Sequence, residues 1–338
     1  MSGSPSNDAA TTSTAPTTPP PVPVLSVAPV VLSTPDRAVG LELRISVPVT
    51  GTGLPVILLS HGQGFSNHLS SLNGYAPLVN YWAAHGFAVI QPTHLSSRSL
   101  TLEPNSPEAP LYWRSRAEDM SRTLDRLDEI EAAVPHLRGR LDHSRVAVAG
   151  HSMGGHTASL LLGARLTDPE DGREVVLADS RITAGVLLAS PGRGGDALTE
   201  QVAKLYPVFL STDFTGMTTP ALVVAGGGDT SEHMTVNGPA WHADPYHLAP
   251  GPKTLLTLFG AEHGLGGISG YDVAETTDED PARVATVQRL TSAYLRSTLY
   301  PADPSWQVAC EGLAAEAEPT GRVESKGASE SASSAASR

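Results

Sequence analysis

The sequence predicts an open α/β fold: a mostly parallel central sheet of about eight strands, with helices on both faces and no large cap domain. Short, nearly continuous apolar runs recur along the chain, and such runs are typical of strands buried on both faces. Stretches with helical spacing of apolar residues separate these runs. Because alternating strands and helices favour a parallel sheet with right-handed crossovers, the two observations together indicate this class.

Eight segments are expected to form the sheet. The first two, Val24–Leu32 and Leu41–Val49, show partial alternation of polar and apolar residues and lie close together in the sequence. We expect them to form an antiparallel pair at one edge. The other six are the apolar runs expected in the parallel part: Pro55–Leu59, Phe87–Ile90, Val146–Ala149, Ala184–Ala189, Ala221–Ala225 and Thr254–Phe259.

Helices are expected between or after these strands, at Tyr75–Ala84, Arg114–Ala133, Met153–Ala164 and Pro281–Leu299. The last of them has Asp280 as a suitable N-cap and a proline at its first position, a combination favoured at helix starts. The segment between the sixth and seventh strands is short. It leaves little room for a large helical cap, so we expect an open cleft.

The two ends of the chain differ in composition from its middle. Residues 1–22 are mostly Ser, Thr, Ala and Pro, and residues 311–338 are rich in Ala, Ser and Glu. Segments with so few bulky apolar side chains cannot bury enough surface to offset the entropy of ordering. We therefore expect disordered tails at 1–22 and 311–338, around one domain at 23–305.

The composition excludes several functional classes. The 338 residues include 35 acidic and 22 basic side chains, a net charge of −13, which argues against nucleic acid or an anionic membrane as partner. A single cysteine, Cys310, excludes a disulfide framework and a cysteine-rich zinc module. No apolar run approaches the ~20 residues of a membrane-spanning helix, and the N-terminus lacks a signal-peptide pattern. We expect a cytoplasmic protein without stable membrane insertion; the sequence does not specify its oligomeric state.

A candidate nucleophile follows the strand expected at 146–149. Residues 150–155, Gly-His-Ser-Met-Gly-Gly, have the G-x-S-x-G pattern between an expected strand and an expected helix. In this context the serine sits on a sharp turn, whose flanking residues approach each other too closely for side chains. The helix N-terminus also favours negative charge that develops there. The alternative for Ser152 is an ordinary helix-capping serine.

A serine nucleophile needs a base and an acid that orients the base, and in such sheets they follow in the order Ser, Asp or Glu, His. Asp229 comes after the strand at 221–225, and His263 comes after the strand at 254–259. The sequence therefore predicts a triad of Ser152, Asp229 and His263. Asp229 could instead be a turn residue, and His263 a solvated loop residue. The rival acids are Asp213, Glu232 and Asp272.

Acyl transfer also needs hydrogen-bond donors for the oxyanion, normally two backbone N–H groups. One is expected from Met153, the residue after the nucleophile, and the other from the loop after an early strand. In that loop, residues 60–64, the amide of Gln63 is the best candidate. We interpret His61 as a loop histidine bonded to the backbone rather than as a second base.

Three loops are expected to form the walls of the cleft: 96–113, 191–217 and 231–252. Their candidate substrate-binding aromatics are Tyr112, Trp113 and Trp241, each of which could equally be packed in the core. The histidines at 233, 242 and 247 match no zinc-binding spacing, so no metal is expected. The glycines before Asp229 lack the Lys-Ser/Thr of a phosphate loop.

These residues resemble the α/β-hydrolase superfamily over about residues 24–300. The resemblance rests on residues 61–64 (His-Gly-Gln-Gly), residues 150–155, Asp229 and His263, in that order. Residues 81–90, 116–127 and the glycine-rich stretch after His263 are further similar to one branch. That branch contains chlorophyllase-like, platelet-activating-factor-acetylhydrolase-like and polyester-cutinase-like esterases. The paired cysteines common in secreted cutinases are absent here.

The resemblance implies hydrolysis of a carboxylic ester, small or polymeric, through an acyl-enzyme and without a metal or organic cofactor. It implies that Ser152 attacks the ester, that His263 moves the proton and that Asp229 orients His263. The amides of Gln63 and Met153 would bind the oxyanion. Alternatives on the same fold are a cofactor-free haloperoxidase or perhydrolase, an acyltransferase or thioesterase, and a non-catalytic binding protein. The intact Ser, Asp and His argue against the last.

Overall fold

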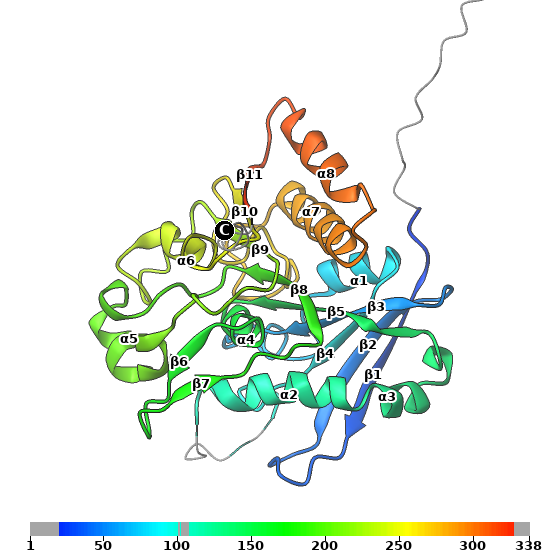
Figure 1. Ribbon diagram of the computed structural model, residues 1–338, viewed down its shortest axis with the longest axis horizontal. Coiled ribbons are helices and arrows are strands. Elements are labelled where there is room, and N and C mark those ends of the chain that lie inside the picture. Colours follow the sequence, from blue (N-terminus) through cyan, green and yellow to red (C-terminus); the bar gives the residue numbers. More distant parts are fainter. Residues whose placement is uncertain (1–19, 101, 103–107, 328–338) are drawn as a thin grey trace, which may run out of the picture.

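The computed structural model describes residues 20–100, 102 and 108–327. Their central sheet has nine strands in the order β1-β2-β4-β3-β5-β8-β9-β10-β11. Figure 1 shows this sheet with helices on both sides, which confirms the predicted α/β class. The strands are β1 (Val24–Leu32), β2 (Leu41–Pro48), β3 (Leu54–Ser60), β4 (Ala88–Pro92), β5 (Leu141–His151), β8 (Ile182–Leu188), β9 (Ala221–Gly226), β10 (Lys253–Leu258) and β11 (Gly321–Lys326).

The middle of the sheet is parallel and its edges are antiparallel. The six strands β4, β3, β5, β8, β9 and β10 pair in parallel with one another in this order. The antiparallel pair expected at one edge is confirmed as β1 with β2, and β2 in turn runs antiparallel to β4. The carboxyl ends of the parallel strands therefore meet at one edge of the sheet, where ligands bind in folds of this kind.

Both faces of the sheet are buried, because successive side chains of a strand point to opposite sides. In β3, Val56 and Leu58 belong to one core cluster, while Ile57 and Leu59 belong to the other. The first cluster lies under α2 (Trp113–Asp125), α3 (Leu127–Ala133) and α4 (Met153–Leu161). The second lies under α1 (Ala76–Ala84), α7 (Pro281–Leu299) and α8 (Ser305–Ala314) (Figure 1).

The single helix expected over 114–133 is in fact two, α2 and α3. The break falls at Arg126, whose φ of −122° leaves the helical region. Met120, Leu124, Leu127 and Ile130 are all buried on the core side. Because the apolar spacing continues across the break, it could not reveal the change of direction.

The expectation of a disordered C-terminal tail from residue 311 is wrong for the residues that the structure describes. Helix α8 continues through Ala314 and buries Ala309 and Leu313. The chain then returns as β11, which pairs antiparallel with β10 over six residues. An outer strand is held by backbone hydrogen bonds and needs little apolar side-chain surface, so its composition resembled that of a tail. Residues 1–19 and 328–338 of the expected tails lie outside the described residues.

Several short elements were not expected from the sequence. A two-stranded antiparallel sheet joins β6 (Arg165–Thr167) to β7 (Glu174–Val176). The segment between β8 and β9 holds one short helix, α5 (Glu200–Leu205), and two 3₁₀ turns at 195–197 and 207–211. A 3₁₀ turn at 238–243 leads into α6 (Asp244–Leu248), and another lies at 135–137. Phe209 and Trp241, on the 3₁₀ turns at 207–211 and 238–243, line a cavity at the carboxyl edge, and the described residues around it form no large cap.

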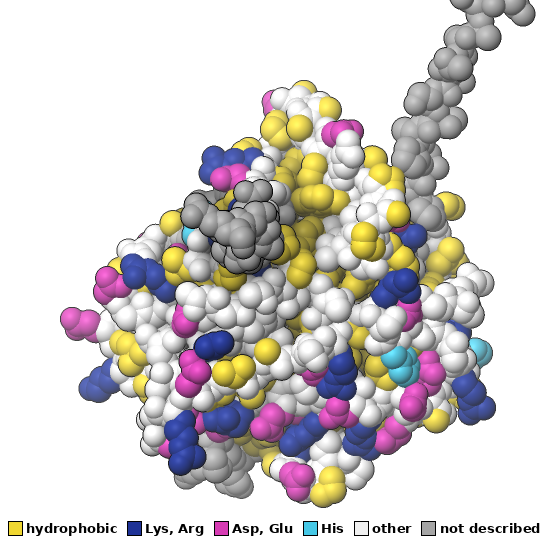
Figure 2. All heavy atoms as spheres, in the orientation of Figure 1, with side chains coloured by type: hydrophobic (Ala, Val, Ile, Leu, Met, Phe, Trp, Pro, Cys, Tyr) yellow, Lys and Arg dark blue, Asp and Glu magenta, His cyan; other side chains and the backbone are white. Residues whose placement is uncertain are grey.

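The surface carries charges of both signs. On the face shown in Figure 2, Lys and Arg side chains are interspersed with Asp and Glu side chains. None of the described helices is both long and apolar enough to span a bilayer.

Candidate active site

Ser152 sits on a strained turn between β5 and α4. Its φ of 54° and ψ of −121° lie in a region that few non-glycine residues adopt. A Cβ on Gly150 would lie 1.9 Å from the carbonyl oxygen of Gly154, and a Cβ on Gly154 would lie 2.0 Å from the carbonyl oxygen of Ser60. Glycine is therefore required at both positions. The turn holds Ser152 at the carboxyl edge of the sheet, where its side chain lines a cavity.

His263 and Asp229 lie beside this serine. The Nε2 of His263 is 2.8 Å from the Oγ of Ser152, and its Nδ1 is 2.8 Å from the Oδ2 of Asp229. The three residues follow β5, β9 and β10, so three strand ends bring together side chains up to 111 positions apart. They form one hydrogen-bonded chain from the buried carboxylate to the serine hydroxyl.

The Asp229 carboxylate is buried and has two more side-chain partners. Its Oδ2 is 3.1 Å from the Nε2 of His242, and its Oδ1 accepts from the Oγ of Ser231 at 2.7 Å. His242 is buried as well, and its Nδ1 donates to the carbonyl of Ser190 at 2.9 Å. Burial alone would raise the pKa of Asp229, but the hydrogen bonds of His242 and His263 outweigh it and hold this pKa well below its usual range. Asp229 is therefore ionised at neutral pH.

The two expected oxyanion donors lie at the same cavity. Gln63 belongs to the loop after β3, and Met153 is the first residue of α4; both line the cavity together with Ser152. The side-chain Nε2 of Gln63 donates to the carbonyl of Pro110 at 3.3 Å. The interpretation of His61 as a loop histidine is confirmed, because its Nδ1 is 2.7 Å from the carbonyl of Gly62.

A family model described as the alpha/beta hydrolase family matches residues 56–325, which include every strand from β4 to β10 and most of β11. The chain belongs to the alpha/beta hydrolase family. No curated protein matches it. Family membership supports hydrolase activity, and the nine-stranded sheet is the fold expected for an α/β hydrolase.

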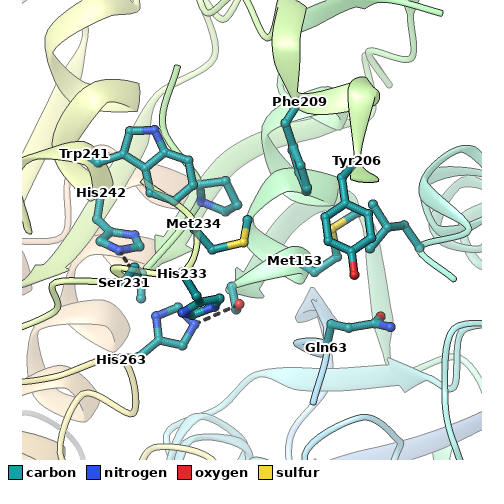
Figure 3. Close-up of a pocket in the computed structure, with 14 residues that line it drawn as sticks. Gln63, Met153, Tyr206, Phe209, Ser231, His233, Met234, Trp241, His242 and His263 are labelled. Atoms are coloured by element: carbon teal, nitrogen blue, oxygen red, sulfur yellow. Dashed lines mark hydrogen bonds between the residues drawn. The ribbon is translucent and has the colours of Figure 1, made fainter. Parts of the chain in front are cut away.

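The cavity of this α/β hydrolase has a volume of about 210 Å³. Figure 3 shows Trp241 and Met234 facing Phe209 and Tyr206 across it, with His263 and Gln63 along the opposite rim. All three loops expected as walls contribute, because Leu111, Pro191 and five residues of the loop at 231–252 line it. No Lys, Arg, Asp or Glu is among the described residues that line this space.

Of the three aromatic residues expected in the walls, Trp241 lines the cavity and the other two do not. Trp113 begins α2 and packs in the core cluster under that helix, with the guanidinium of Arg114 over its ring. Tyr112 is buried as the residue before α2, with a φ of 50°. The neighbouring Leu111 takes the wall position instead, because the start of α2 turns its two aromatic residues away from the cavity.

A buried cation, Arg116, lies behind the loop that carries Gln63. The guanidinium of Arg116 donates to the carbonyl of His61, and to the hydroxyls of Ser96 and Thr157 at 2.6 and 3.1 Å. Burial lowers the pKa of Arg116 to about 9, so the group stays charged at neutral pH. This cation restrains the backbone just before Gln63. The sequence alone did not indicate this role of Arg116.

A metal would find one candidate position among the described residues. Asp229, His242 and His263 offer ligand atoms that all lie within 4.8 Å of one another. These atoms are already hydrogen bonded, so an ion there would replace the bond between His263 and Asp229. Sequence reasoning weighed His242 as a metal ligand because of its neighbouring histidines. No local pattern could show that it contacts Asp229.

Proposed function

We propose that this α/β hydrolase cleaves carboxylic esters through an acyl-enzyme on Ser152. The observation that carries the proposal is the hydrogen-bonded chain in which His263 contacts Ser152 and Asp229 at 2.8 Å each. A neutral imidazole between a hydroxyl and an ionised carboxylate can take the serine proton and is stabilised once it is charged. The proposal includes membership of the esterase branch suggested by the sequence.

In the proposed reaction, Ser152 Oγ attacks the ester carbonyl while His263 Nε2 takes its proton. The N–H groups of Gln63 and Met153 receive the oxyanion. His263 then gives the proton to the leaving alcohol, and the Ser152 acyl ester remains. Water, deprotonated by His263, hydrolyses that ester and restores the serine.

The size and lining of the cavity indicate a short, uncharged acyl or alcohol group. Its volume of about 210 Å³ lies below the roughly 300–1,000 Å³ typical of pockets for drug-sized ligands. Apolar side chains such as Met234 and Phe209 face it, and an ionic group would lose its hydration there without a charged partner. We therefore expect short-chain esters to be better substrates than long-chain ones.

The test is hydrolysis of p-nitrophenyl esters, from acetate to palmitate, by the wild type and by Ser152→Ala. We expect wild-type turnover that is highest on short chains and a loss of roughly 10³-fold or more in Ser152→Ala. Ser159→Ala, which removes another buried hydroxyl from the same helix, should stay near the wild-type rate. Equal turnover in Ser152→Ala and wild type would reject the serine mechanism. A folded wild type that is silent on the whole series would reject simple ester hydrolysis and favour the transferase or perhydrolase alternatives.

A further inference from the structure

Two buried side chains that take no part in the proposed reaction connect three loops of the site. Tyr75 precedes α1 and His151 precedes Ser152; both are buried. The hydroxyl of Tyr75 lies 2.8 Å from the backbone nitrogen of Gly62 and 2.9 Å from the Nδ1 of His151. The Nε2 of His151 lies 2.8 Å from the carbonyl oxygen of His263. A continuous hydrogen-bonded chain therefore runs from the loop after β3, past the serine turn, to the loop after β10.

The protons of this chain have one consistent arrangement. The carbonyl of His263 can only accept, so His151 carries a proton on Nε2. Burial lowers the pKa of His151 to about 3 and raises the pKa of Tyr75 far above neutral, so the imidazole holds one proton and the phenol keeps its own. The Nδ1 of His151 is then an acceptor for the Tyr75 hydroxyl. The oxygen of Tyr75 in turn accepts from the N–H of Gly62.

The packing around Gly62 shows how closely the three loops approach. A Cβ at Gly62 would lie 3.1 Å from the Tyr75 hydroxyl and 3.2 Å from the Nδ1 of His151. The backbone must come this near for its N–H to reach Tyr75. Gly62 precedes Gln63, so the bond orients the peptide next to an expected oxyanion donor.

At its other end, the hydrogen-bonded chain reaches His263, whose side chain is only partly packed. The side chain of His263 is 41% exposed, and the residue sits in a loop rather than in a strand. Its ring is bonded to Asp229 and Ser152, and the bond from His151 to its carbonyl restrains its backbone. Reacting groups need to be held within about 1 Å of their productive positions, because a misplacement of that size costs on the order of 10²-fold in rate.

We propose that Tyr75 and His151 are positioning residues that fix the Gln63 amide and the His263 imidazole relative to Ser152. The inference rests on the proposed function. It predicts that loss of the Tyr75 hydroxyl loosens both loops at once, although no reacting atom is removed. Turnover would then fall while the apolar cavity that binds the substrate stays unchanged.

The experiment compares Tyr75→Phe with Tyr294→Phe on a short p-nitrophenyl ester. Tyr294 is also buried, but it lies on α7 against Trp306, away from the site, so its variant controls for loss of a hydroxyl from a buried tyrosine. We expect kcat per titrated active site to fall about 10- to 100-fold in Tyr75→Phe, with KM changed less than threefold. Tyr294→Phe should keep the wild-type kcat. His151→Gln, which retains a donor and an acceptor, should keep more activity than His151→Leu.

A second readout does not depend on turnover. Hydrogen–deuterium exchange of the folded proteins should be faster in Tyr75→Phe than in wild type, both at residues 61–64 and at residues 263–266, and unchanged there in Tyr294→Phe. Wild-type kcat with unchanged exchange in Tyr75→Phe would overturn the proposal. So would a loss confined to the fraction of titratable enzyme, because that indicates misfolding alone. If the wild type itself cleaves no ester, the proposed function fails, and the exchange data still decide whether the two loops are coupled.

Discussion

Asp229 contacts two histidines of very different exposure. The side chain of His263 is 41% exposed, whereas that of His242 is 1% exposed. An imidazole that borders the cavity can reach the reacting groups, and a buried one can support the carboxylate. His242 has a fixed orientation, because its Nδ1 donates to the carbonyl of Ser190. Both histidines contact the Oδ2 of Asp229, and Ser231 contacts the Oδ1, so the orientation of the carboxylate depends on His242 and Ser231 as well as on His263.

Replacement of His242 by alanine tests this support. The variant leaves Asp229 and the Ser190 carbonyl with one partner fewer each, so we expect the free energy of unfolding to fall by about 1–3 kcal/mol. If orientation worth ~1.4 kcal/mol is lost as well, kcat falls about tenfold. Steady-state kinetics and urea titration measure the two effects. His247→Ala, at an exposed position on α6, is the matched control. A destabilised His242→Ala with wild-type kcat would mean that His242 serves the fold alone.

At the scale of helices and strands, local sequence patterns fix the position of some elements, and pairing between distant segments fixes the position of others. Helix α7 starts where the sequence predicts, because the Asp280 side chain accepts from the N–H groups of Ala282 and Arg283 at 2.9 and 3.2 Å. Such a cap is worth about 1 kcal/mol. Strand β11 has no comparable local signal. Its place depends on six backbone partners in β10, from Lys253 opposite Lys326 to Leu258 opposite Gly321.

Removal of β11 should therefore cost stability and expose the edge of β10. We compare a chain that ends at Thr320 with one that ends at Gly327. The free energy of unfolding of the shorter chain should be roughly 2–4 kcal/mol lower, because each lost backbone hydrogen bond contributes about 1 kcal/mol. An uncovered strand edge also invites association. Denaturant titration and light scattering of the two chains measure these effects. Equal stability and solubility would show that β11 contributes nothing to the domain.

At the scale of the whole molecule, the interior contains an unusual set of polar groups. Burial lowers the pKa of four fully buried histidines, and for the last two the value is about 3: His61, His94, His151 and His156. Burial also raises the pKa of Asp119 to about 6, although its ion pair with Arg37 opposes the rise. All five side chains are buried, so a proton taken up by any of them on acidification changes the stability of the fold.

The stability of the molecule should fall steeply below pH 6.5. The four histidines take up protons in the unfolded chain from about pH 6.5 downward, while the folded chain resists protonation to much lower pH. Each uncompensated proton removes ~1.4 kcal/mol of stability per pH unit. Asp119 has the opposite effect on stability between about pH 6 and pH 4. Its carboxylate takes up a proton in the folded chain before it does in the unfolded chain, so acidification in this range favours the folded state. The net effect is a loss of stability on acidification that is dominated by the histidines.

His156→Leu isolates one histidine in this prediction. Both ring nitrogens of His156 lack a hydrogen-bond partner within the described part of the chain, so the change removes a titrating group without breaking a bond seen there. The free energy of unfolding, measured by urea titration at pH 7.5, 6, 5 and 4.5, should depend less steeply on pH in this variant than in the wild type. We expect the slope to be smaller by ~1.4 kcal/mol per pH unit, the contribution of one proton. A slope identical to that of the wild type would contradict buried, neutral His156.

The sequence by itself determined most strands of the central sheet and the residues that follow the parallel strands at their carboxyl ends. Apolar runs and helical spacing report local burial and backbone shape, so eight of the nine strands of the sheet and the start of α7 could be predicted. The glycines around Ser152 reflect contacts within a six-residue turn. Asp229 and His263 could be selected because they follow strands that must end at the same edge.

The tertiary structure alone decided which distant groups touch. The approach of His242 to Asp229, the chain from Gly62 through Tyr75 and His151 to His263, and the pairing of β11 with β10 leave no local pattern in the sequence. They arise only when folding brings segments that are far apart in the sequence into contact. Helix α2 likewise turned Trp113 into the core, since the rotation of a helix about its axis is set by all of its packing partners together.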